Sequence, residues 1–142
     1  MPVVLLVAAI LVILCVGIHF LFLEALSTLL PRLRSPKRLR MGIVILGAIV
    51  GHLIEILMFA VGIAALASSG KHGALQGELH AGLRDYYYYS AVTFTSLGYG
   101  DLTPIGHLRL LASVEALTGL VLIAWTASFA YLQMQRFWGK DL

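Results

Sequence analysis

Three long apolar stretches constrain this chain more than any other feature of its sequence. They cover residues 2–30, 41–67 and 108–134, and only a few polar side chains interrupt them. A helix that crosses the hydrocarbon core of a bilayer needs roughly 20 apolar residues, and each stretch exceeds that length. Only 12% of the 142 residues are charged, against about 25% in an ordinary soluble domain. We therefore predict an all-α membrane protein with three transmembrane helices, and we exclude a soluble enzyme.

The first stretch is predicted to be a retained helix and not a signal peptide. It has no Lys or Arg before the apolar run, and the run is about twice as long as a signal-peptide core. Residues 1–30 are accordingly expected to form an N-terminal transmembrane helix. The single cysteine, Cys15, lies inside this run and cannot form an internal disulfide.

The distribution of positive charge predicts the orientation of the chain. Seven of the ten Lys and Arg lie in the linker 31–40 or after the third apolar stretch. Because positive residues favour the cytoplasmic side, we expect a multi-pass protein of the cell membrane with its linker and its tail, residues 139–142, in the cytoplasm and its N-terminus outside. Prolines break the linker, and its basic side chains either set this topology or contact anionic lipid headgroups. These side chains are Arg32, Arg34, Lys37, Arg38 and Arg40.

The segment between the second and third stretches does not resemble a full span. Residues 68–84 are polar and glycine-rich, which predicts an external loop. Residues 85–95 then form an apolar and aromatic run of half a membrane's length, with Asp85 as a candidate N-cap. Glycine-rich backbone follows it, and such backbone cannot face lipid because its polar groups would lack partners. A short re-entrant helix is therefore predicted here.

The residues after this helix read Thr-Ser-Leu-Gly-Tyr-Gly-Asp from Thr95 to Asp101. This segment resembles the potassium-channel family, whose filter is usually written Thr-Val-Gly-Tyr-Gly-Asp, with Ser96 and Leu97 replacing Thr and Val. The resemblance covers roughly residues 41–135 and suggests a small bacterial three-helix member in which the first helix is additional. It implies a pore domain over residues 41–138, with an outer helix 41–67, a pore helix 85–95, a filter 96–101 and an inner helix 107–138.

The resemblance also implies how ions would be bound. Backbone carbonyls would replace the water shell of a potassium ion, and the Ser96 hydroxyl would close the inner end of the filter. Glycine supplies the unusual dihedral angles that inward-pointing carbonyls need. The implied potassium-binding residues are Ser96, Leu97, Gly98, Tyr99 and Gly100. One chain supplies one strand of this ring, so a homotetramer is the smallest working unit. No cofactor other than permeant K⁺ and no nucleic-acid partner is expected.

Several residues are expected to support the filter. By the same resemblance, Tyr99 should pack against the pore helix, where Tyr88 and Tyr89 stand at the positions of the aromatic residues that surround the filter in the potassium-channel family. The alternative role for these tyrosines is an aromatic belt at the membrane interface. Asp101 could accept a hydrogen bond from Tyr88 or Tyr89. Glu115 lies in the third span, where a free charge is costly, so we expect it to bond the pore-helix region through Thr93 or Thr95.

Gly119 on the inner helix has two readings, a hinge or a position of close helix packing. Helical spacing from a hinge at Gly119 would turn a set of apolar side chains toward a central cavity. The set is Leu120, Ile123, Ala124, Ala127 and Tyr131.

Three more ionisable residues lie at membrane depth, namely His19, His52 and Glu55. His52 and Glu55 are three residues apart and share one helix face, which favours a structural hydrogen bond between them. Metal binding by this pair is not expected, because the sequence shows no third ligand. No specific role follows for His19.

These observations predict a potassium-selective channel and not an enzyme, because no nucleophile–base pair or metal-ligand constellation is present. Two alternatives remain open at this point. One is a weakly selective monovalent cation channel, since Ser96 and Leu97 depart from the commonest filter. The other is a non-conducting membrane subunit that regulates another protein.

Overall fold

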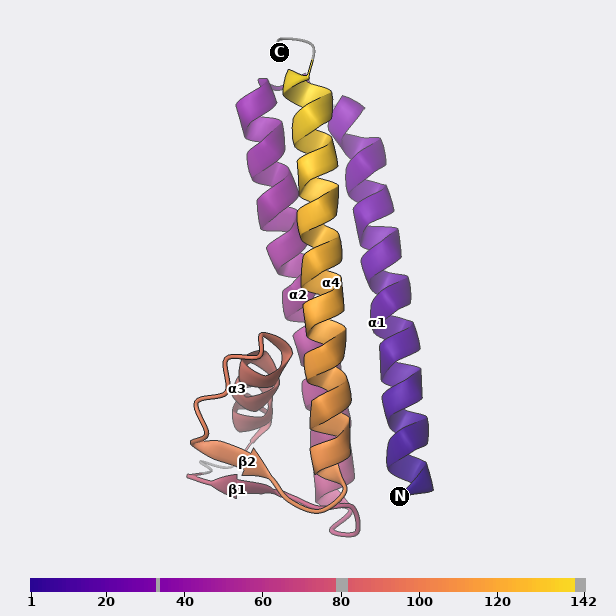
Figure 1. The fold of residues 1–142 in the computed structure, drawn as a ribbon, viewed down its shortest axis with the longest axis vertical. Coiled ribbons are helices and arrows are strands. Elements are labelled where there is room, and N and C mark those ends of the chain that lie inside the picture. The colour runs from indigo at the N-terminus through magenta and orange to yellow at the C-terminus, as the bar shows by residue number, and fades with distance from the viewer. Residues whose placement is uncertain (33, 79–81, 140–142) are drawn as a thin grey trace.

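The computed structural model describes residues 1–32, 34–78 and 82–139 (Figure 1). Three long helices, α1, α2 and α4, lie side by side as a bundle. A shorter helix, α3, and a two-stranded ribbon lie together at the end of the bundle where the N-terminus is found. The elements in order are α1 (Pro2–Leu29), a 3₁₀ turn η1 (Leu30–Arg32), α2 (Lys37–Ser68), β1 (Leu75–Gly77), α3 (Leu83–Phe94), β2 (Leu102–Pro104) and α4 (Leu108–Trp138).

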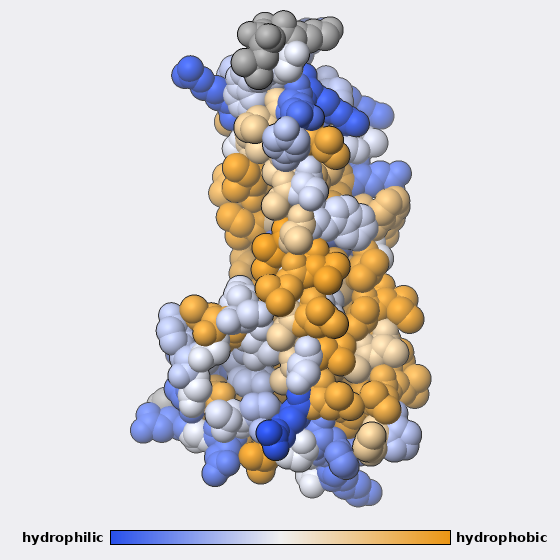
Figure 2. All heavy atoms as spheres, viewed as in Figure 1, coloured by the Kyte–Doolittle hydropathy of each residue, from blue (hydrophilic) through white to orange (hydrophobic). Residues whose placement is uncertain are grey.

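The three long helices confirm the predicted apolar spans. They contain 28, 32 and 31 residues, which corresponds to about 42–48 Å of helix, longer than the roughly 30 Å hydrocarbon core. Each is long and apolar enough to cross a membrane. On the face shown in Figure 2, hydrophobic residues cover the middle of the molecule and hydrophilic residues gather at both ends.

The second helix begins earlier than the sequence suggested. It starts at Lys37 and not at residue 41, with Pro36 as its extended N-cap residue. A proline at this position costs the helix no hydrogen bond, because the first N–H groups of a helix have no intrahelical partner. Lys37, Arg38 and Arg40 therefore belong to the first turns of α2 and not to a linker.

The main buried cluster lies where α3 meets the bundle. Helix α3 packs against both α2 and α4, and buried side chains from all three meet there. The largest members of the cluster include Phe59, Phe94, Leu108, Leu111 and Leu122. A smaller cluster of Leu23, Leu26, Leu30 and Val44 joins α1 to α2 near the opposite end. The fold is thus built to hold α3 firmly in one half of the molecule.

A small antiparallel ribbon departs from the all-α prediction. Strand β1 pairs with β2 so that Leu75 lies opposite Pro104 and Gly77 opposite Leu102. The sequence did not reveal it because strands of three residues are too short to show alternating hydrophobicity. The ribbon joins the segment before α3 to the segment after residue 101, so both flanks of the intervening loop are held together.

Helix α3 begins at Leu83, two residues before the predicted start, and ends at Phe94. Its N-cap residue is Gly82, so Asp85 is not the N-cap residue that we expected. Asp85 lies in the first turn of α3, where its negative charge is favourable beside the positive end of the helix dipole.

Candidate functional site

The loop of residues 95–101 has an alternating backbone conformation. Ser96, Gly98 and Gly100 have positive φ angles of 58°, 61° and 80°, whereas Leu97 and Tyr99 do not have positive φ. Alternation of this kind turns successive peptide groups so that their carbonyl oxygens can face the same side. We expected the unusual angles only at the two glycines. Ser96 is the only non-glycine residue with positive φ in the described part of the chain, at a cost of about 1–2 kcal/mol.

The C-terminal end of α3 fixes the start of this loop. The N–H of Ser96 donates to the carbonyl of Thr93 at 2.9 Å. The N–H groups of Leu97 and Gly98 both donate to the carbonyl of Val92, at 2.9 and 3.4 Å. These bonds offset the strain at Ser96 and satisfy carbonyls that the helix leaves unpaired. The negative end of the α3 dipole therefore lies against the loop.

A side-chain bond fixes the far end of the loop. The Tyr88 hydroxyl donates to Oδ2 of Asp101 at 2.7 Å, so the structure selects Tyr88 from the two tyrosines that we considered. This bond lowers the pKa of Asp101 and raises the pKa of Tyr88. Tyr89 is instead buried among apolar side chains, which raises the pKa of its phenol.

Tyr99 is exposed in the single chain, and its packing against a pore helix in an assembled channel stays a prediction. In the single chain its side chain is 68% exposed, so it does not pack against its own α3. The neighbouring Leu97 is 55% exposed. The loop thus presents its two bulky side chains outward from the chain.

Glu115 of α4 is fully buried, and its carboxyl oxygen Oε1 forms a hydrogen bond with the hydroxyl of Ser90 on α3. The partner is therefore Ser90 and not Thr93 or Thr95; the Thr95 hydroxyl donates to the carbonyl of Ala91 at 2.7 Å. Ser90 Oγ also lies 2.8 Å from the carbonyl oxygen of Ile56 on α2.

The hydrogen count at Ser90 indicates the protonation of Glu115. A serine hydroxyl has one hydrogen to donate, yet both neighbours of Ser90 Oγ are acceptors when Glu115 is ionised. Both contacts are satisfied when the Glu115 carboxyl is protonated and donates to Ser90, which then donates to Ile56. Oε2 of Glu115 has no hydrogen-bond partner among the described residues, which also favours the neutral acid. The chain Glu115–Ser90–Ile56 links α4, α3 and α2.

Gly119 contacts the end of α3. A Cβ atom at this position would overlap the carbonyl oxygen of Phe94, so close packing accounts for the glycine in this structure. The five side chains predicted to face a cavity, Leu120, Ile123, Ala124, Ala127 and Tyr131, are all exposed. They lie on a face of α4 that the rest of the chain leaves open.

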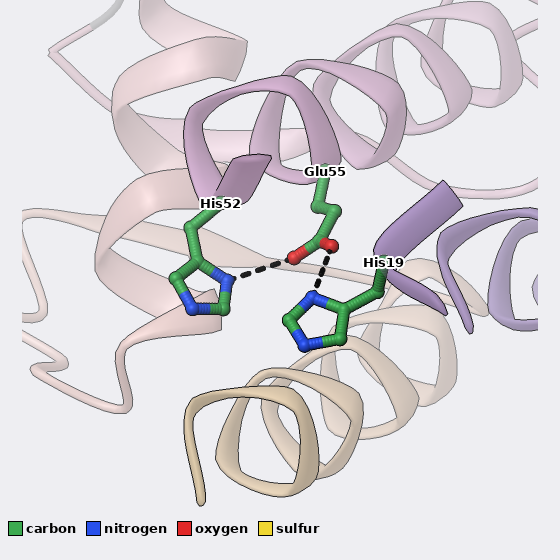
Figure 3. A group of neighbouring side chains, drawn as sticks. All are labelled: His19, His52 and Glu55. Atoms are coloured by element: carbon green, nitrogen blue, oxygen red, sulfur yellow. Dashed lines mark hydrogen bonds and ion pairs between the residues drawn. The ribbon is translucent and has the colours of Figure 1, made fainter. Parts of the chain in front are cut away.

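His19, His52 and Glu55 form a compact group at the meeting of α1 and α2 (Figure 3). The expected bond between His52 and Glu55 is present at 2.8 Å. Sequence reasoning missed His19, which lies 2.8 Å from the other carboxylate oxygen. A third potential metal ligand therefore exists, which overturns the reason that we gave against metal binding.

The basic residues gather at the end of the molecule opposite α3. Arg32, Arg34, Lys37 and Arg38 are exposed there. Arg40 is half-buried, and its guanidinium lies 5.9 Å from the ring centre of Phe137 near the end of α4.

The chain has three apolar helices of membrane-spanning length, and a short helix and a glycine-rich loop lie between the second and the third. This arrangement defines a small membrane protein of the channel type. A family model described as an ion channel matches residues 42–135, about two-thirds of the chain, and the chain belongs to this ion channel family.

Two curated relatives carry the name Protein LctB. The one from Bacillus caldotenax is 50% identical over 42 residues, which cover 30% of this chain and 31% of that protein. The one from Geobacillus stearothermophilus is 36% identical over 75 residues, or 49% of this chain and 56% of that protein. The chain thus spans about a third and about half of the lengths of these relatives. No solved structure matches the chain.

Proposed function

We propose that this ion channel is selective for potassium and that the 95–101 loop is its selectivity filter. The alternating backbone of residues 96–100 carries the proposal. A potassium ion that sheds its water needs a ring of oxygens in return, and aligned backbone carbonyls supply one. The Ser96 hydroxyl adds a further oxygen at the end of the loop next to α3.

Electrostatics favours cations on both sides of this loop. The carbonyl end of α3 offers partial negative charge without a buried ion. At the outer side, a cavity of about 420 Å³ is lined by Glu78, Asp85, Tyr88, Asp101 and Leu102. Its three carboxylates would raise the local concentration of cations at the entrance.

A homotetramer follows from the geometry of a carbonyl ring, because one chain contributes one strand and four are needed to surround an ion. Helix α3 would then be a re-entrant pore helix, shielded from lipid by neighbouring chains. Such an assembly would cover the surfaces that the single chain leaves exposed or turn them toward the pore. These surfaces are the side chains of Leu97 and Tyr99 and the open face of α4.

The proposed orientation places the basic end, with residues 31–40, in the cytoplasm and the α3 end outside. Basic side chains near the membrane surface would each gain about 1 kcal/mol from anionic lipid. A cysteine at Ser69, introduced in a Cys15→Ser background, should react with an impermeant thiol reagent on intact cells. A cysteine at Ser35 should stay unlabelled, and the reverse pattern would invert the orientation.

Flux measurements in liposomes test the function directly. Purified protein should carry K⁺ down its gradient and exclude Na⁺. Equal passage of the two ions would instead identify a weakly selective cation channel. Absence of any flux from a correctly assembled tetramer would support a non-conducting subunit.

A further inference from the structure

His19, His52, Glu55 and Thr126 form a closed polar group that we call the three-helix junction, because its members come from α1, α2 and α4. The Glu55 carboxylate lies between the two imidazoles (Figure 3). Its Oε1 atom is 2.8 Å from Nδ1 of His19, and its Oε2 atom is 2.8 Å from Nδ1 of His52. On the far side of the rings, the Thr126 hydroxyl lies 3.0 Å from Nε2 of His52 and 3.4 Å from Nε2 of His19.

The junction is shielded from its surroundings. Glu55 is 0% exposed and His19 is 3% exposed, and His52 is half-buried against the ring of Phe94. Ionisable groups at such a depth are costly unless they are paired or hold an ion. Nothing in the conduction pathway proposed above uses these side chains.

Counting hydrogens shows that the junction is short of one positive charge. With neutral histidines, each Nδ1–H donates to the Glu55 carboxylate, so both Nε2 atoms are acceptors. The Thr126 hydroxyl has one hydrogen and can serve only one of them. The group then carries the negative charge of Glu55 among apolar helices, with one nitrogen left without a donor. A divalent cation bound at the Nδ1 and carboxylate atoms neutralises Glu55, and the imidazole protons then stand on the two Nε2 atoms, which donate to the Thr126 oxygen instead of needing a donor.

The donor atoms indicate which cation fits. Two imidazole nitrogens and one carboxylate oxygen suit zinc, whose sites with three protein ligands keep a fourth position for water. Hard cations such as Mg²⁺ and Ca²⁺ prefer oxygen ligands throughout. The three potential ligand atoms lie within 4.8 Å of one another. Neighbouring ligands of a tetrahedral zinc ion stand roughly 3.4 Å apart, a spacing that falls between the 2.8 Å of the two hydrogen bonds and the 4.8 Å limit of the group.

We propose that the three-helix junction is a binding site for a divalent transition metal, with zinc as the best-fitting ion. His19, His52 and Glu55 are its ligands, and a water molecule takes the fourth position. On binding, each neutral imidazole keeps its single proton, which moves through solvent from Nδ1 to Nε2, so that Nδ1 holds the ion and both Nε2–H groups donate to the Thr126 hydroxyl oxygen. The ion joins α1 to α2, and the Nε2 atoms of the two liganding histidines hold Thr126 of α4 beside them, which gives α1 a function that the filter does not require.

Metal analysis of the purified protein tests the site without any measurement of conduction. Protein with an affinity tag that lacks histidine should be stripped with a chelator, exchanged into Zn²⁺ or Co²⁺ and desalted. We expect about one metal per chain and a tetrahedral cobalt absorption spectrum, together with a higher thermal midpoint. The double variant His19→Gln/His52→Gln should lose at least about 90% of the bound metal, since only one ligand remains.

Matched variants keep the test decisive. His107→Gln removes an exposed histidine outside the junction and should bind metal as the unmodified chain does. His52→Cys keeps a zinc ligand, so it should retain metal and add a thiolate band to the cobalt spectrum even if the double variant fails to fold. A chain that holds no stoichiometric metal, or a folded double variant that binds it fully, would overturn the proposal and leave a proton as the missing positive charge.

Discussion

The 95–101 loop and the three-helix junction both place polar groups among apolar helices, but they satisfy those groups in different ways. The loop uses backbone N–H and carbonyl groups from consecutive residues, such as Ser96 with Thr93 and Leu97 with Val92. The junction uses side chains that are up to 107 residues apart in the sequence, as in the contact between His19 and Thr126.

This difference sets what each region tolerates. The loop depends on backbone conformation, so a change that removes no polar atom can still destroy it. The junction depends on the shape and hydrogen-bonding capacity of its side chains, so an isosteric replacement should preserve much of it. Four sets of variants test this contrast.

The largest effect is expected in the loop. Gly98→Ala or Gly100→Ala should abolish selective conduction, because a Cβ atom opposes their φ angles of 61° and 80° even though nothing crowds either site. Gly70 is a matched control, since its φ of 65° is similar and its surroundings are equally open. Gly70→Ala should conduct K⁺ normally. Normal selectivity in either loop variant, measured as K⁺ and Na⁺ flux, would refute the filter assignment.

The next largest effect is expected at the junction. In buffer with a chelator, Glu55→Leu should reduce the free energy of unfolding by about 1–3 kcal/mol for each of the two buried histidine N–H groups that lose their acceptor. Glu55→Gln keeps an acceptor oxygen and should cost only about 1–3 kcal/mol. The exposed Glu24 of α1 is the control, and Glu24→Leu should change stability by no more than about 0.5 kcal/mol. Equal losses at positions 24 and 55 would show that the junction does not stabilise the bundle.

Glu115 should show a smaller effect that depends on shape. Glu115→Leu leaves the Ser90 hydroxyl without its donor and should cost about 1–3 kcal/mol, with unstable conduction. Glu115→Gln can donate an N–H in place of the acid proton and should be milder. A double-mutant cycle with Ser90→Ala measures the coupling, and Ser113→Ala on the exposed face of α4 serves as its control. Additive losses at positions 90 and 115 would disprove the bond between them.

The smallest effect concerns the bond from Tyr88 to Asp101. Because this bond lowers the pKa of Asp101, its contribution to stability is complete above the ordinary carboxyl pKa and is lost as the pH falls through the lowered value. Tyr88→Phe should move the pKa of Asp101 back up toward its ordinary value, which NMR titration of the carboxyl can follow. Tyr87→Phe should leave the titration unchanged, and an unmoved pKa in Tyr88→Phe would assign the shift to another cause.

The sequence by itself determined the parts that depend on neighbouring residues. Length and apolar composition predict the three long helices, because burial in a bilayer is a property of the whole run. The half-length run before Gly98 predicts α3 to within two residues at its start. The glycines at 98 and 100 predict left-handed backbone, since glycine adopts it at no steric cost.

Only the tertiary structure decided which side chains meet. Glu115 faces Ser90 instead of Thr93 or Thr95, and Tyr88 instead of Tyr89 reaches Asp101, because the rotation of α3 about its axis sets which face each neighbour presents. His19 meets Glu55 because α1 and α2 are placed along each other so that the two residues lie at the same level. The residue pattern of one helix does not indicate how far its neighbour is shifted along the shared axis. Partners on separate helices therefore emerge only when packing fixes both rotation and depth.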